Sequence, residues 1–83
     1  MSGGYAHTRL AAVLDLLARR GLDEFAFVQA MAVALGLRPL HVSEALEELV
    51  AVGYVDRHAL IAHPLAYSVT PAGLRAASAA RGA

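Results

Sequence analysis

The hydrophobic pattern of this chain changes its period at Gly53, and this change limits the folds open to it. Before Gly53, apolar residues recur at the spacing of one helix face, at Val42, Ala45, Leu46, Leu49 and Val52. After it, residues 54–58 and 65–69 have the composition of short strands, and Pro64 marks a turn between them. The sequence therefore predicts a helix that runs from Pro39 to about Val52 and passes through Gly53 into a β-hairpin.

Two further helices flank this unit. The first is predicted from Ala6 to Arg20, with Gly21 as its stop. Its apolar stripe consists of Leu10, Val13, Leu14 and Leu17. A last, alanine-rich helix is predicted from Ala72 to about Ala80, with Thr70 as its N-cap and Pro71 at its first position.

The segment between the first helix and Pro39 allows two interpretations. In one, Asp23 caps a second helix that runs to about Leu35. The apolar stripe of that helix would be Phe25, Val28, Met31, Ala32 and Leu35. In the other, residues 24–27 form a short extended piece before a helix that begins near Phe27. In both, residues 36–39 make a turn between two helices, which predicts a helix-turn-helix unit.

Length and composition favour one small domain. The chain has 83 residues, of which 58% are hydrophobic and only 6% aromatic, so its core must be built mainly from Ala, Val and Leu. We expect residues 6–80 to form this domain, residues 1–5 to be a flexible leader and residues 81–83 a flexible tail.

Several functions lack support in the sequence. There is no cysteine, and the histidines show no metal-ligand spacing, so we expect no metal and no cofactor. Adjacent acids such as Glu47 and Glu48 point about 100° apart on a helix, and Ser43 has no base set beside it, so we assign no catalytic residue and expect no enzyme activity. No apolar run is long enough to span a bilayer, and residues 1–4 lack the features of a secretory signal. We therefore expect a cytoplasmic protein without a membrane partner.

Three segments carry a resemblance to a known family. Residues 42–55 (VSEALEELVAVGYV) resemble the pattern V-S-x-x-L-x-x-L-x-x-x-G-x-V, and residues 67–74 (YSVTPAGL) are similar to Y-x-L-T-x-x-G. Residues 35–37 are similar to an L-G-L turn between two helices. In this order the segments resemble winged helix-turn-helix domains, in particular MarR-like and PadR-like transcriptional regulators. The resemblance covers most of residues 6–80 and implies a mostly α fold: a three-helix core, a two-stranded wing and a C-terminal helix.

The resemblance also implies binding to double-stranded DNA. In such domains the third helix enters the major groove through its N-terminal half, and the wing reaches the neighbouring backbone or minor groove. The residues that this arrangement brings to nucleic acid are Arg38, Leu40, His41, Ser43, Glu44, Glu47, Arg57 and His58. Among them, we expect Arg38, Ser43 and Arg57 on phosphates and His41 near base edges.

The charge pattern favours a second hypothesis. Seven basic residues, all of them Arg, balance seven acidic ones, whereas nucleic-acid binders usually carry a basic excess. Glu44, Glu47 and Glu48 are predicted on the outer face of the third helix, although a single glutamate there can accept a hydrogen bond from cytosine. The expected wing tip, residues 59–66, is apolar. In this alternative the winged helix does not bind DNA and docks onto a protein partner through its apolar wing and acidic helix face.

A homodimer is expected as well, because a lone domain of this composition struggles to cover its apolar surface. The candidate dimer or partner surface consists of Leu16, Leu60, Ile61, Leu65, Leu74 and Ala77.

Overall fold

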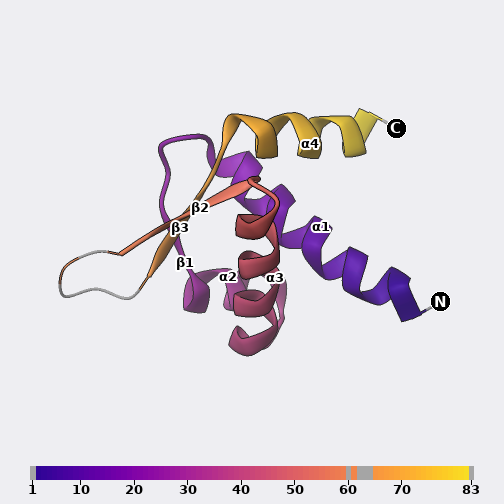
Figure 1. The fold of residues 1–83 in the computed structure, drawn as a ribbon. Helices are drawn as coiled ribbons and strands as arrows, with labels where there is room; N and C mark the ends of the chain where they lie inside the picture. The colour runs from indigo at the N-terminus through magenta and orange to yellow at the C-terminus, as the bar shows by residue number, and fades with distance from the viewer. Residues whose placement is uncertain (1, 60, 62–64, 83) are drawn as a thin grey trace.

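The computed structural model describes residues 2–59, 61 and 65–82 of the chain. Within them, helices and strands follow in the order α1 (Ser2–Arg20), β1 (Ala26–Phe27), α2 (Val28–Leu35), α3 (Pro39–Ala51), β2 (Val55–His58), β3 (Ala66–Val69) and α4 (Pro71–Gly82). In Figure 1 the helices gather on one side, and β2 and β3 project away from them. The predicted architecture, mostly helical with a small hairpin before the last helix, is confirmed.

Helix α1 ends where the sequence predicts, but it begins earlier than predicted. The helix begins at Ser2 instead of Ala6, and it ends at Arg20 as predicted. Gly21 follows with φ of 102°, a conformation that glycine adopts without the steric cost that other residues meet. The flexibility expected of residues 1–5 and 81–83 stays a prediction.

The segment after α1 adopts the extended alternative. β1 pairs antiparallel with β3, with Ala26 opposite Tyr67, and α2 begins only at Val28. The predicted helix cap at Asp23 is therefore wrong, and Phe25 lies outside α2 with 44% of its surface exposed. Strand pairing satisfies backbone groups of β1 and outweighs the local capping signal. The sheet has the order β1-β3-β2, one strand more than the predicted two-stranded wing.

The apolar face of α3 is buried over most of its length. Val42, Ala45, Leu46 and Leu49 are each at most 5% exposed, as the helical pattern predicts. Val52, predicted to face inward with them, is 62% exposed, so that prediction is wrong. The reason is that Val52 occupies the C-cap position with ψ of 0°, where the chain has already left the helical path.

The core lies where α1, α2, α3 and the sheet meet. Its largest fully buried side chains are Tyr67, Leu17, Met31, Leu46, Val13, Val42 and Val55. Each buried aliphatic side chain of this size contributes about 1.5–3 kcal/mol relative to an exposed one. Tyr67 is the aromatic member of this group, and it comes from the central strand β3.

Four residues join the end of α3 to the start of α4, and we call them the α3–α4 latch: Gly53, Tyr54, Thr70 and Gly73. The Thr70 N–H donates to the Tyr54 carbonyl at 3.0 Å, and the Thr70 hydroxyl donates to the Gly53 carbonyl at 2.7 Å. The same hydroxyl oxygen accepts from the Gly73 N–H at 3.0 Å, so Thr70 caps α4 as predicted. A Cβ at Gly73 would lie 2.1 Å from the Tyr54 carbonyl oxygen, so glycine alone permits this approach.

We predict that Gly73→Ala lowers the free energy of unfolding by about 1–3 kcal/mol, because the added methyl group has no space beside the Tyr54 carbonyl. Gly82→Ala is the matched control, since among the described residues no other part of the chain lies within 4 Å of a Cβ at that position. Urea denaturation followed by circular dichroism measures both variants. Equal stability of the two would contradict the close packing of the latch.

Candidate nucleic-acid interface

Several of the predicted site residues lie in or just before the N-terminal half of α3, where they are exposed or half-buried. Arg38 is exposed at the N-cap position, where its side chain makes no capping hydrogen bond. Leu40 is 65% exposed and Glu44 is exposed, whereas His41 and Ser43 are half-buried. These five residues lie within the first two turns of the helix, so they form one continuous stretch.

Glu47 links α3 to the hairpin. Arg57 of β2 donates through Nη1 to Glu47 Oε1 and forms an ion pair with it. The hydroxyl of Tyr67, on β3, donates to Glu47 Oε2 at 2.9 Å. Arg57 and Tyr67 are direct partners in the antiparallel register, so both strands present these side chains to the same carboxylate. Glu47 therefore connects α3 to both strands of the hairpin.

These contacts shift two pKa values in opposite directions. The hydrogen bond from Arg57, followed by that from Tyr67, lowers the pKa of Glu47 from its ordinary value of 4.5, so the group is ionised at neutral pH. Burial, followed by the hydrogen bond to Glu47, raises the pKa of Tyr67 from 10.0 to about 12. Both shifts favour the form that the network requires, a carboxylate acceptor and a neutral phenol donor.

His58 faces away from this network. It follows Arg57 on β2, and successive strand residues point to opposite faces of the sheet. Its ring stacks on Phe25 with centroids 4.5 Å apart, and its Nε2 lies 2.8 Å from the buried Ser68 hydroxyl. The structure thus brings Glu47 and Arg57 together and separates Arg57 from His58.

Two residues with roles here were not predicted from the sequence. Tyr67 holds Glu47, and Ser68 holds His58. Both depend on the register between β2 and β3, which pairs Arg57 with Tyr67 and Asp56 with Ser68. The sequence predicts β3 as a strand, but it does not specify the register with the partner strand.

The candidate dimer or partner surface is divided between the core and the hairpin. Ala77 is buried within the chain, and Leu16 and Leu74 are half-buried against its core, so little of these three side chains is open to a partner. Ile61 is 94% and Leu65 43% exposed near the end of the hairpin. Leu60 lies outside the described residues.

Neither a metal centre nor a membrane span is found in residues 2–59, 61 and 65–82. No group of three or more His, Asp or Glu side chains there is arranged to hold a metal ion. No helix there is long and apolar enough to cross a membrane.

A three-helix core, a hairpin fixed beside the third helix and a C-terminal helix define the winged-helix fold, with β2 and β3 as its wing. Solved structures of ZitR from Lactococcus lactis share it. A single mutant of ZitR matches with a TM-score of 0.73 and 20% identity over 89% of this chain and 49% of that one. A double mutant in its apo form matches with a TM-score of 0.76 and 18% identity over 96% and 59%, so this chain spans about half the length of ZitR. No family model and no curated protein matches the sequence.

We predict an alkaline loss of stability that belongs to Tyr67. Because its folded pKa lies above the unfolded value, its contribution is complete below pH 10.0 and is lost as the pH rises toward about 12. The expected loss is about 2 kcal/mol in the free energy of unfolding. The chain has no Lys or Cys, so among its side chains the tyrosines are the groups that titrate in this range.

Urea denaturation at several pH values between 9 and 12 checks this expectation. Tyr67→Phe should show a nearly flat alkaline limb, whereas Tyr54→Phe should keep the loss, because the Tyr54 hydroxyl makes no hydrogen bond among the described residues. The same alkaline loss in both variants would contradict the assignment to Tyr67.

Proposed function

We propose that this chain is a winged-helix DNA-binding protein and acts as a transcriptional regulator related to the MarR-like and PadR-like families. Its fold matches the solved structures of ZitR, which supports the proposal at the level of fold. The observation that carries it is the link between α3 and the wing through Glu47, Arg57 and Tyr67. This link holds the helix and the hairpin as one surface, which a single duplex can contact.

The proposed contacts divide between the two elements. The N-terminal half of α3 enters the major groove, with Arg38 and Ser43 on phosphates and His41 near base edges. Arg57 contacts a phosphate from the wing. Leu40, Glu44 and Glu47 also belong to the helix side of this surface, and His58 to the wing side. The functional unit is a cytoplasmic homodimer.

The Glu47 carboxylate competes with the phosphates of DNA for Arg57. Arg57 has to exchange the carboxylate for a phosphate, while Tyr67 continues to donate to Glu47. An exposed ion pair of this kind is worth at most about 1 kcal/mol, so a phosphate can replace it. Binding is therefore expected to be weak at physiological salt and to depend mainly on two arginines per chain.

Titration of a fluorescent random-sequence duplex at low salt tests the proposal. The slope of log affinity against log salt should be about −2 per chain, from the two arginine–phosphate contacts at about −0.9 each, because the uncharged Ser43 adds nothing to it. Arg38→Ala and Arg57→Ala should each reduce the slope by about 1 and weaken binding to every sequence. Arg75→Ala is the matched control, because Arg75 is exposed on α4. Figure 1 shows α4 at the opposite end of the molecule from the start of α3.

Unchanged binding in both arginine variants would contradict this orientation on DNA. No binding at micromolar protein, together with a co-purifying protein partner, would instead support a protein-interaction module that docks through the apolar wing and the acidic helix face. Light scattering measures the homodimer directly, and a monomer at high concentration would exclude it.

Glu47→Gln should strengthen binding to DNA, whereas the arginine variants should weaken it. The amide no longer competes with phosphate through a negative charge, so affinity for the random duplex should rise by up to about fivefold. The double variant Glu47→Gln with Arg57→Ala is the control, and it should lose most of this gain. An equal gain with and without Arg57 would mean that Glu47 acts only by repelling the duplex.

A further inference from the structure

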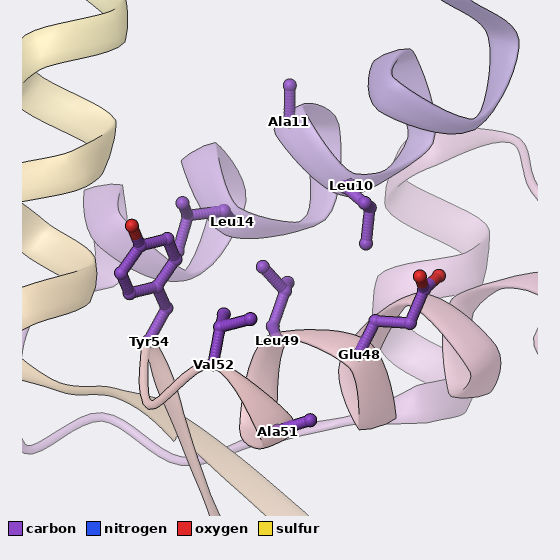
Figure 2. A pocket seen from close by; sticks show the side chains of 8 residues that line it. All are labelled: Leu10, Ala11, Leu14, Glu48, Leu49, Ala51, Val52 and Tyr54. Carbon is purple, nitrogen blue, oxygen red and sulfur yellow. The ribbon is translucent and has the colours of Figure 1, made fainter. Parts of the chain in front are cut away.

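An apolar groove lies between α1 and the C-terminal end of α3. Figure 2 shows Leu10 and Leu14 above it, Leu49 and Val52 below it, and Tyr54 and Glu48 at its two ends. Ala11 and Ala51 complete the lining, and the volume is about 480 Å³. Small-molecule sites are mostly apolar recesses of about 300–1,000 Å³ with a few polar groups, and this groove meets that description.

The polar groups of the groove stand at its ends and have no partners among the described residues. Glu48 is exposed, and its carboxylate forms neither an ion pair nor a hydrogen bond within residues 2–59, 61 and 65–82. It is also the one charged side chain in the lining. A carboxylate at the end of an apolar recess favours a ligand with an apolar body and one positive charge.

The size of the groove favours a small molecule over a second copy of the chain. Eight residues line it, whereas a stable protein interface engages about 20–30 residues on each side. Half-buried Leu10 and Tyr54 together with 62% exposed Val52 leave apolar surface that a compact ligand can cover. The occupant that fits is therefore a small hydrophobic amine.

We propose that this groove is a binding site for small hydrophobic amines, with the apolar body between Leu14 and Leu49 and the ammonium group at Glu48. Val52 and Tyr54 flank Gly53, so the ligand contacts the turn that joins α3 to the wing. This turn is part of the α3–α4 latch. A role of this ligand as an effector rests on the proposed regulatory function, whereas binding itself does not require DNA.

Calorimetry and amide NMR with 1-naphthylmethylamine test the site without DNA. The amine should bind with a Kd of about 1 mM or tighter, and the shifted amides should come from α1, the end of α3 and Tyr54. The matched anion, 1-naphthoate, should bind about fivefold more weakly. Glu48→Gln should remove this preference, and the control Glu24→Gln, an exposed acid before β1, should keep it.

A groove-filling variant separates this site from other surfaces. Ala51 is exposed at the margin of the groove, so Ala51→Phe should fill the space, preserve the fold by circular dichroism and abolish binding of both probes. Amide shifts confined to other surfaces, or unchanged binding in Ala51→Phe, would overturn the proposal. So would a wild-type dimer that Ala51→Phe dissociates in sedimentation, because the groove would then be an interface between two copies.

Discussion

The α3–α4 latch is the constraint on which the rest of the structure depends. It holds the turn at Gly53 and Tyr54 against Thr70 through two hydrogen bonds, and Gly73 allows α4 to lie directly on that turn. Strand β2 begins just after the turn and β3 ends just before Thr70, so the latch closes the base of the hairpin. The pairing of Val55 with Val69 next to it sets the register for every pair beyond.

The link between α3 and the wing is a consequence of that register. Two residues beyond Val55, Arg57 faces the same side of the sheet and meets Tyr67 across the strands. Tyr67 has its ring in the core, 1% exposed, and its hydroxyl at Glu47. A tyrosine suits this position because an apolar body and a polar tip serve packing and hydrogen bonding at once. The position of the wing is thus fixed by core packing first and by charge second.

Local signals explain which parts of the fold the sequence could predict. Pro39, Gly53 and the pair Thr70–Pro71 mark boundaries by their own backbone preferences, and the structure has α3, the hairpin and α4 near those places. For residues 24–27 the sequence left a helix and an extended piece open, because the pairing that decides between them is with β3, which lies about 40 residues later. The ties of Glu47 and His58 to Tyr67 and Ser68 also required the register, although period-2 alternation alone separates His58 from Arg57.

The same geometry places the three glutamates on the outer face of α3 in different surroundings. Glu47 is turned to the wing and paired with Arg57, while Glu48 lies at the end of the groove beside α1. Adjacent helix residues point about 100° apart, so these two acids belong to different surfaces. Glu44, in the N-terminal half of α3, forms no ion pair with any other described residue. Glu44 and Glu48 are both exposed, so the acidic character of α3 is divided between two of its surfaces and is not removed from either.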